Sequence, residues 1–196
     1  MNFIFDIGNV LISFQPLPFL GSLFSERLLI DKLYKTVFQS PEWTKFDQGT
    51  LTHEEACHIF CMREPDVQQE IRQVMQHLKD TLIPMPDTVA LLPEIKKAGH
   101  DLYYLSDNHK ELGRYLVNTH SFFELFDGGV FSCDVHVRKP AAEIYRYLLE
   151  KYQLDPRECL FFDDKEENVA AANKEGMHGV LFTDAACVKP FLNRPV

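Results

Sequence analysis

The chain has 196 residues, of which 45% are hydrophobic and 25% charged, a composition typical of a soluble globular protein with a sizeable core. Its formal net charge of −9 argues against general nucleic-acid binding, and an anionic substrate would need a local cation, either a metal or a placed lysine. No segment approaches the roughly 18 apolar residues of a membrane span and no signal peptide opens the chain, so we expect a cytoplasmic protein without membrane partners.

The five cysteines predict neither a disulfide framework nor a metal site. Their number is odd and their spacing irregular. Cys57 and Cys61 flank His58, but no second ligand pair follows with the spacing of a zinc site. We therefore expect reduced thiols.

The first predicted element is a short apolar strand that ends in an aspartate. Residues 3–6 read Phe-Ile-Phe-Asp, and Gly8 follows two residues later. In an open α/β sheet, ligands bind at the carboxyl ends of the strands, so Asp6 is a candidate site residue. The alternative is an aspartate that starts a turn after an edge strand.

A long segment with only helical patterning follows, from residue 17 to residue 82. Apolar residues recur at helical spacing over 27–38. Thr52 and Glu55 form a capping box, and Pro65 suits the first turn of a further helix. We predict an insertion of four helices.

This segment divides the predicted core into residues 1–16 and 83–196, with a helical domain at 17–82. Two pairs of prolines bound the insertion, and we expect hinges there: Pro16, Pro18, Pro84 and Pro86.

Strands and helices alternate in the rest of the chain, which predicts an α/β fold with a parallel sheet covered on both faces. The predicted strands are 101–105, 129–131, 159–162 and 179–182, and the predicted helices are 88–98, 110–117, 141–152 and 166–174. Pro93 is unfavourable inside the first of these helices.

Three of the predicted strands end in polar residues, namely Asp6, Ser106 and the pair Asp163 and Asp164. Parallel neighbours would bring these tips into one crevice. Clustered carboxylates repel one another, and Mg²⁺, which prefers oxygen ligands, would offset the repulsion. Lys139, just before a predicted helix, is a candidate fixed cation. The alternative is that each aspartate only caps the helix that follows it.

The order of these motifs resembles the haloacid dehalogenase-like superfamily of phosphohydrolases. The motifs are FDxGNV, Leu-Ser plus a polar residue, Arg-Lys-Pro, and FFDD followed by Asn168. The resemblance spans the chain and implies a Rossmann-like parallel sheet flanked by helices, with a helical cap inserted after the first strand. FDxGNV and FFDD are similar to a bacterial subgroup of small sugar-phosphate phosphatases that includes α-glucose-1-phosphatase.

By this resemblance, Asp6 is the nucleophile that takes the phosphoryl group. Asp6, the carbonyl of Gly8 and Asp164 would hold Mg²⁺, with Asp163 as a direct or water-mediated ligand. The metal would offset the charge of the nucleophile and of the transition state.

The remaining motif residues are expected at the substrate. Ser106 and the backbone amide of Asp107 would bind a phosphate oxygen, and Asn9 is also placed among the substrate-binding residues. Lys139 would pair with the phosphate and with Asp6, which makes it catalytic as well. Asn168 would orient Lys139 or the waters on the metal.

Two positions depart from the family pattern. Most family phosphatases have a second aspartate, the general acid, where this chain has Gly8, and general acid catalysis is worth about 10²–10⁴-fold. The resembling subgroup shares the glycine, and Asp47 of the insertion is a candidate replacement. Asp107 stands where the subgroup often has asparagine, so only its backbone is expected to bind phosphate.

The predicted function is a Mg²⁺-dependent phosphatase of a small phosphorylated metabolite, such as glucose 1-phosphate or another hexose phosphate. Trp43, Phe46 and Asp47 are candidates to face the cleft, although the two aromatic residues would more often be core. His109 and His136 lie near the motifs and are expected to be structural.

Three alternatives stay open. A metal-independent 2-haloacid dehalogenase also uses an aspartate nucleophile, but it has an aromatic-Gly-Thr sequence where this chain has Gly8-Asn9-Val10. A phosphomutase would normally need the missing second aspartate. A non-catalytic protein would keep the site only to bind phosphate or metal.

Overall fold

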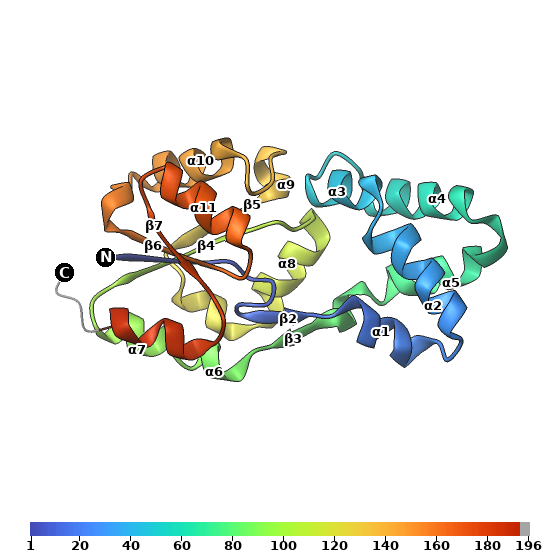
Figure 1. Ribbon diagram of the computed structural model, residues 1–196, viewed down its shortest axis with the longest axis horizontal. Coiled ribbons are helices and arrows are strands. Elements are labelled where there is room, and N and C mark those ends of the chain that lie inside the picture. The colour runs from blue at the N-terminus through green and yellow to red at the C-terminus, as the bar shows by residue number, and fades with distance from the viewer. Residues whose placement is uncertain (193–196) are drawn as a thin grey trace.

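The computed structural model describes residues 1–192, whose largest element is a five-stranded sheet (Figure 1). All neighbouring strands in this sheet are parallel. Their order is β5 (Gly128–Phe131), β4 (Asp101–Ser106), β1 (Asn2–Phe5), β6 (Cys159–Asp163) and β7 (His178–Leu181). The predicted α/β fold with a parallel sheet is confirmed.

Strand β1 lies at the centre of the sheet because both of its faces are apolar. Phe3 and Phe5 pack into one hydrophobic cluster, while Ile4 packs into another on the opposite face. Phe5 pairs with Tyr104 of β4 and Phe162 of β6. A strand that is buried on both faces has a continuous run of apolar residues in its sequence.

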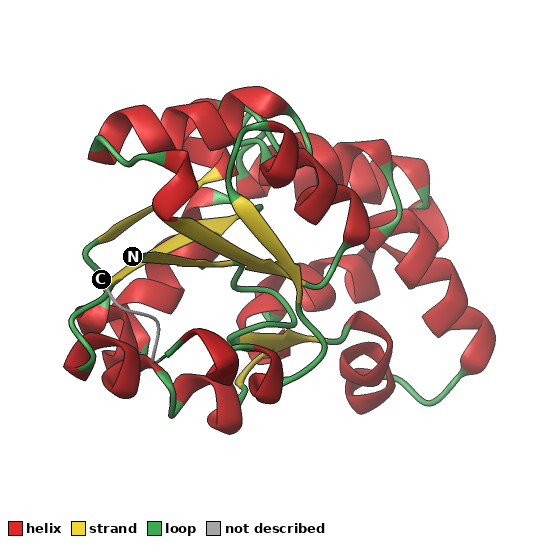
Figure 2. Ribbon diagram, turned by 60° about the vertical axis from the view of Figure 1, so that its left-hand side comes forward, coloured by secondary structure: helices red, strands yellow, loops and turns green. Residues whose placement is uncertain are grey.

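Helices cover both faces of the sheet, as Figure 2 shows. One face carries α10 (Ala142–Tyr152) and α11 (Glu166–Lys174), and the other carries α6 (Pro86–Val89), α7 (Leu92–Lys97) and α8 (Lys110–Thr119). The predicted helix 88–98 is wrong in one respect, since it is divided into α6 and α7. Pro93 lies in the first turn of α7, where proline is tolerated.

Residues 16–81, the helical insert, form a second lobe with its own hydrophobic cluster (Figure 1). It contains five α-helices, so the prediction of four was wrong. They are α1 (Pro16–Leu23), α2 (Arg27–Leu33), α3 (Pro41–Asp47), α4 (His53–Arg63) and α5 (Gln68–Gln76). The predicted capping box at Thr52 and Glu55 is present at the start of α4.

The two segments that lead into and out of the helical insert pair with each other. Strand β2 (Ile12–Phe14) is antiparallel to β3 (Leu82–Pro84). The sequence patterns indicated proline-rich linkers here, not strands. Each strand has three residues, too few to show an alternating pattern, and the pairing joins segments about 70 residues apart. The lobes are therefore joined by a paired ribbon.

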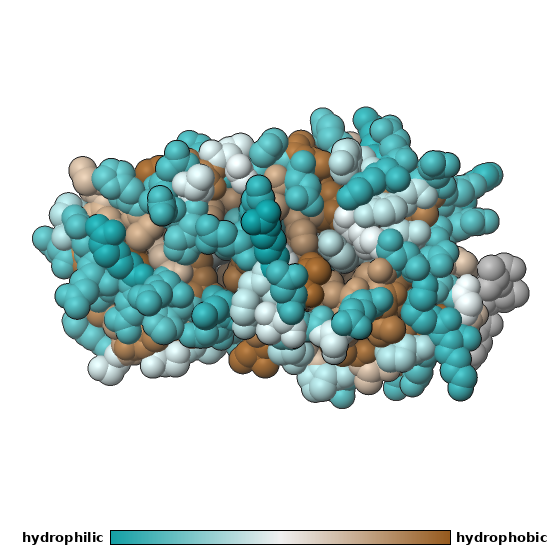
Figure 3. Space-filling view, turned by 180° about the vertical axis from the view of Figure 1, so that it is seen from behind, coloured by the Kyte–Doolittle hydropathy of each residue, from teal (hydrophilic) through white to brown (hydrophobic). Residues whose placement is uncertain are grey.

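Three further features complete the fold. Helix α9 (Ser132–Val135) follows β5 and was not predicted. Among residues 1–192, no helix has the length and apolar character needed to cross a membrane. The face in Figure 3 is largely hydrophilic, with smaller hydrophobic areas between the polar side chains.

Candidate active site

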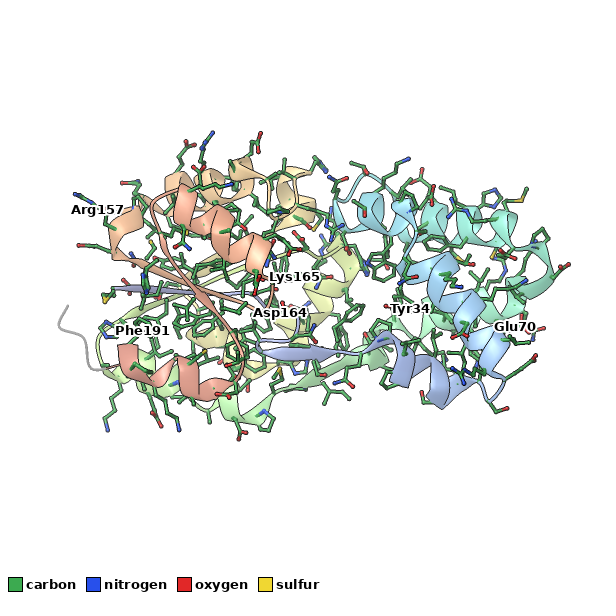
Figure 4. The ribbon with its side chains drawn as sticks, in the orientation of Figure 1. Tyr34, Glu70, Arg157, Asp164, Lys165 and Phe191 are labelled. Carbon is green, nitrogen blue, oxygen red and sulfur yellow. The ribbon has the colours of Figure 1, made fainter. Side chains whose placement is uncertain are left out.

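The polar strand tips meet at the carboxyl end of the sheet, facing the helical insert. Asp6 follows β1, Ser106 ends β4, and Asp164 follows β6; all three line one cavity of about 270 Å³. Figure 4 shows Asp164 and Lys165 between the sheet and the insert. Parallel pairing of β1 with β4 and β6 brings these tips together.

Lys139 forms the centre of a buried charge cluster. Its Nζ lies 2.8 Å from Oδ1 of Asp6 and 2.6 Å from Oδ2 of Asp163. Burial lowers the pKa of Lys139, but the carboxylates of Asp6 and Asp163 outweigh this and raise the pKa above its ordinary value. Lys139 is therefore a fixed ammonium at the strand tips.

Asp163 is fully buried and both of its oxygens accept hydrogen bonds. Besides Lys139, the side-chain amide of Asn168 donates to both oxygens at 2.9 and 3.0 Å, and the backbone N–H of Lys165 donates to Oδ1 at 2.9 Å. These contacts orient Lys139 toward Asp6. Asn168 thus acts on Lys139 through Asp163.

Asp6 is itself held in place by backbone contacts. Its Oδ1 accepts a hydrogen bond from the N–H of Ile7 at 2.7 Å, and its own N–H donates to the carbonyl of Phe162 at 2.8 Å. Burial raises the pKa of Asp6 above its ordinary value, and the ammonium of Lys139 opposes this shift. The carboxylate is therefore positioned but costly to ionise without a cation.

The residues at this end fit a hard divalent cation. Carboxylate oxygens of Asp6, Asp163 and Asp164 all lie within 4.8 Å of one another. Three carboxylates face one ammonium, so the cluster carries excess negative charge, and oxygen donors suit Mg²⁺. Asp164 is half-buried and accepts a hydrogen bond from Asn9 at 3.3 Å.

The predicted substrate residues lie around the same cavity. Ser106 and Asp107 line it, and so does Asn9. The side chain of Asn9 is tied to Asp164 and to the N–H of Phe14, at 3.3 and 3.0 Å, so in this structure it supports a carboxylate at the site.

The carboxylate of Asp107 is occupied by two donors. Its Oδ1 accepts from the N–H of Lys139 at 3.0 Å, and its Oδ2 lies 3.3 Å from Nε of Arg138. Motif reading identified Arg138 only as part of Arg-Lys-Pro. The structure shows that it also reaches the insert, where its guanidinium donates to Thr44 Oγ1 at 3.0 Å.

Part of the cavity lining is an apolar wall, most of which the sequence patterns did not identify. Phe14, Phe38 and Trp43 form an aromatic group with ring centroids 4.9 to 6.3 Å apart. Leu82 of the ribbon lies in the same lining. Trp43, expected more often to be core, faces the cavity, whereas Phe46 is buried in the insert.

Asp47, the last residue of α3, is a buried carboxyl group that lines the cavity from the insert side. Its Oδ2 lies 3.6 Å from the guanidinium of Arg138. Burial raises the pKa of Asp47 to about 8, against the opposing effect of Arg138. The group therefore differs from an ordinary surface aspartate.

The two histidines near the motifs serve the junction between the lobes. His109 stacks on Phe46 with ring centroids 3.8 Å apart, and burial lowers its pKa to about 3. His136 Nδ1 lies 2.8 Å from the carbonyl of Gln48. Neither histidine is part of the cavity lining formed by the described residues.

Comparison with known proteins gives one family and several relatives. A family model of haloacid dehalogenase-like hydrolases matches residues 1–176. "Sesquiterpene phosphatase astK" of Aspergillus oryzae is 29% identical over 188 residues, which is 95% of this chain and 92% of the relative. "Flavin mononucleotide hydrolase 1" of Arabidopsis thaliana is 25% identical over 150 residues, 73% of this chain and 57% of the relative.

Solved structures show the same fold. The HAD family enzyme bt-2542 of Bacteroides thetaiotaomicron, in complex with magnesium and inorganic phosphate, aligns with a TM-score of 0.69 at 19% identity and covers 93% of each chain. A dehalogenase aligns with a TM-score of 0.76 at 16% identity, covering 99% of this chain and 97% of the other. At these identities the likeness concerns the fold alone.

Proposed function

The chain belongs to the haloacid dehalogenase-like hydrolase family, and we propose that it is a Mg²⁺-dependent phosphatase of a small phosphomonoester. The observation that carries the proposal is the buried contact between Asp6 and Lys139, at 2.8 Å, with Asp164 beside it at the strand tips. A carboxylate nucleophile, a fixed cation and a hard-cation site are the components that phosphoryl transfer through an aspartyl-phosphate needs.

In this proposal Asp6 attacks the phosphorus and carries the phosphoryl group until water releases it. Lys139 pairs with Asp6 and with the phosphate, while Ser106 and the amide of Asp107 bind a phosphate oxygen. Asp6, the carbonyl of Gly8 and Asp164 would hold Mg²⁺, and Asp163 would act directly or through a water. The ion, when bound, supplies positive charge against the phosphate and the transition state.

We propose residues 17–82 as a cap over the core formed by 1–16 and 83–196. The ribbon of β2 and β3 is the connection between them; Pro84 ends β3 on the core side, and Pro16 begins α1 just beyond β2 on the insert side. The cap closes the cavity with Trp43 and Phe38, which would keep bulk water from the phosphoryl-enzyme.

For the substrate, the apolar wall favours an apolar leaving group over a hexose. A sugar would leave its hydroxyls facing Phe14, Phe38 and Trp43, and buried polar groups without partners are costly. The similarity to a protein named as a sesquiterpene phosphatase supports the same choice. The resemblance of FDxGNV to α-glucose-1-phosphatase supports a hexose phosphate, which is the second candidate.

A panel of phosphate esters tests both the activity and the substrate class. We expect Mg²⁺-dependent phosphate release, with a higher kcat/KM for decyl phosphate than for glucose 1-phosphate. Trp43→Ala is expected to lower kcat/KM for decyl phosphate about tenfold, the effect of losing about 1.4 kcal/mol of apolar contact. Leu28→Ala, at an exposed side chain of the same insert, is the matched control and should leave kcat/KM unchanged for both esters.

Other results of the panel would identify the alternatives. Higher activity on glucose 1-phosphate that Trp43→Ala does not alter would favour the hexose phosphate. Chloride release from 2-chloropropionate without metal would identify a dehalogenase. Saturable phosphate binding without turnover would identify a binding protein.

Metal binding can be measured without activity. We expect Mg²⁺ at about 100 times its Kd to stabilise the protein by about 2.7 kcal/mol, which raises Tm by roughly 5–10 °C in a chain of this size. Asp164→Asn should remove most of this shift because it neutralises a ligand. The control is Glu166→Gln, an exposed acidic residue two positions away. An unchanged shift in Asp164→Asn would contradict the site.

A further inference from the structure

The proposed function leaves one proton without a source, because an ester's alkoxide must be protonated as it leaves. The usual general-acid position of the family is occupied here by Gly8. A Cβ built at Gly8 meets no atom within 4 Å, so the space beside the nucleophile is open. The donor must then come from another wall of the cavity.

Four aspartates of the described chain line the cavity, and three of them have other contacts or roles. In the proposed function Asp6 is the nucleophile, and Asp164 belongs to the carboxylate cluster that would hold Mg²⁺. Asp107 is bound through both oxygens to Arg138 and to the amide of Lys139. Asp47 is the remaining carboxyl group, and it lines the cavity from the helical insert.

The loop after Asp47 is docked on the core, which holds this carboxyl group at the cavity. The hydroxyl of Ser132 in α9 donates to the carbonyl of Asp47 at 2.5 Å. Gly49, at φ +67°, approaches α9 so closely that an added Cβ would lie 2.8 Å from Cβ of Cys133. A side chain at Gly49 would therefore push the loop away from the core.

The surroundings of Asp47 keep its proton on at neutral pH. Burial raises its pKa to about 8; Arg138 and Lys165 oppose the shift, as does a hydrogen bond from Trp43, and Asp107 adds to it. The Cys133 thiol, on α9, has a pKa that is raised mainly by burial, to which the charge of Asp47 adds slightly. The carboxyl group is thus a neutral acid within a cavity that also contains fixed charges.

We propose that Asp47 is the proton donor to the leaving oxygen, an inference that rests on the proposed phosphatase function. As the ester O–P bond breaks and the bond from Asp6 to phosphorus forms, the proton of Asp47 passes to the leaving oxygen and yields the alcohol. Water then attacks phosphorus, the bond to Asp6 breaks, and a proton of that water returns to Asp47. The products are the alcohol and inorganic phosphate.

This assignment couples proton transfer to the position of the insert. The nucleophile belongs to the sheet and the acid to α3, so both are present only when the insert lies against the core. Arg138 links the two, since it contacts Asp107 of the core and both Asp47 and Thr44 of the insert.

The test compares Asp47→Asn with wild type on two esters that differ in their need for an acid. Decyl phosphate has an alkoxide leaving group, whereas para-nitrophenyl phosphate releases a stable phenolate. We expect kcat/KM to fall about 10²–10⁴-fold for decyl phosphate and by less than about threefold for para-nitrophenyl phosphate. The parameter kcat/KM reports the steps up to phosphoryl transfer, before water attacks.

A control separates proton transfer from a purely structural role. Thr44→Ala removes a hydrogen bond between the insert and Arg138 but no acid. We expect it to affect the two esters equally. Equal losses on both esters in Asp47→Asn, or no loss on either, would overturn the assignment. A wild-type protein that cleaves neither of these esters nor glucose 1-phosphate would overturn the proposed function, and with it this inference.

Two pH measurements give independent readouts. In wild type, kcat/KM for decyl phosphate should fall above about pH 8 as Asp47 ionises, and this limb should be absent in Asp47→Asn. Folding raises the pKa of the Asp47 carboxyl group from 3.8 to about 8, so the free energy of unfolding of the wild-type protein decreases as pH rises through that range. The Tm of Asp47→Asn relative to wild type should therefore increase from pH 5 to pH 8, and a constant difference would contradict the buried neutral acid.

Discussion

Replacing Asp6 by asparagine is expected to abolish phosphate release, with a fall in kcat on the order of 10⁶, the size seen when an enzyme nucleophile is removed. Asparagine has nearly the same shape and keeps an oxygen for the N–H of Ile7, which donates to Asp6 at 2.7 Å. The amide cannot form the aspartyl-phosphate. Phosphate release from the preferred ester in saturating Mg²⁺ measures the loss.

The control for this variant is Asp155→Asn, the same change at a half-buried residue outside the cavity lining, which is paired with Arg157. It should retain wild-type activity. Thermal unfolding of Asp6→Asn should show a folded protein, because Lys139 keeps its contact with Asp163 at 2.6 Å. Phosphate release near the wild-type rate from folded Asp6→Asn would refute the aspartyl-phosphate mechanism.

Lys139→Met is expected to lower both stability and activity. Removing one partner of a buried ion pair costs about 3–5 kcal/mol because it leaves the other charge uncompensated. Here two carboxylates, Asp6 and Asp163, are 7% and 0% exposed and would face each other without a cation. In a chain of this size the loss corresponds to a decrease in Tm of roughly 6–20 °C. The Tm of Lys139→Met should be measured in the presence of a chelator, since a divalent cation would offset part of the repulsion between Asp6 and Asp163.

A double variant separates charge from packing. In Lys139→Met with Asp163→Asn, one of the two uncompensated charges is removed, so part of the stability should return although activity should not. The two single variants, Lys139→Met and Asp163→Asn, complete the cycle. A loss of stability in the double variant equal to the sum of the losses in the single variants would mean that Lys139 and Asp163 are not coupled. That result would contradict the arrangement in which Asp163 orients Lys139.

The chemistry of the site is divided between the two lobes. The strand tips of the sheet carry the proposed nucleophile, the ammonium and the acidic cluster, which are held by backbone and buried side-chain contacts. The helical insert contributes Trp43, Phe38 and Asp47. In the proposed mechanism, substrate choice and proton transfer therefore depend on the insert, whereas capture of the phosphoryl group depends on the sheet.

Local sequence patterns were sufficient to predict the strands of the sheet and the polar residues at their carboxyl ends. The apolar run before Asp6, the alternation of strands and helices, and the capping box at Thr52 each reflect interactions within a few residues or a simple burial period. The strand tips could be predicted to meet because parallel strands place their carboxyl ends at one edge. Asp6, Lys139 and Asp163 therefore lie together as the motif order indicated.

The contacts between the lobes depend on distant parts of the chain. The pairing of Ile12–Phe14 with Leu82–Pro84, the bridge from Arg138 to Asp47 and the orientation of Trp43 each join residues whose separation leaves no periodic pattern. FDxGNV indicated the candidate nucleophile, Asp6, from residues that are adjacent in sequence. The raised pKa of Asp47 depends on the folded protein, because it results mainly from burial and not from its neighbours in the sequence.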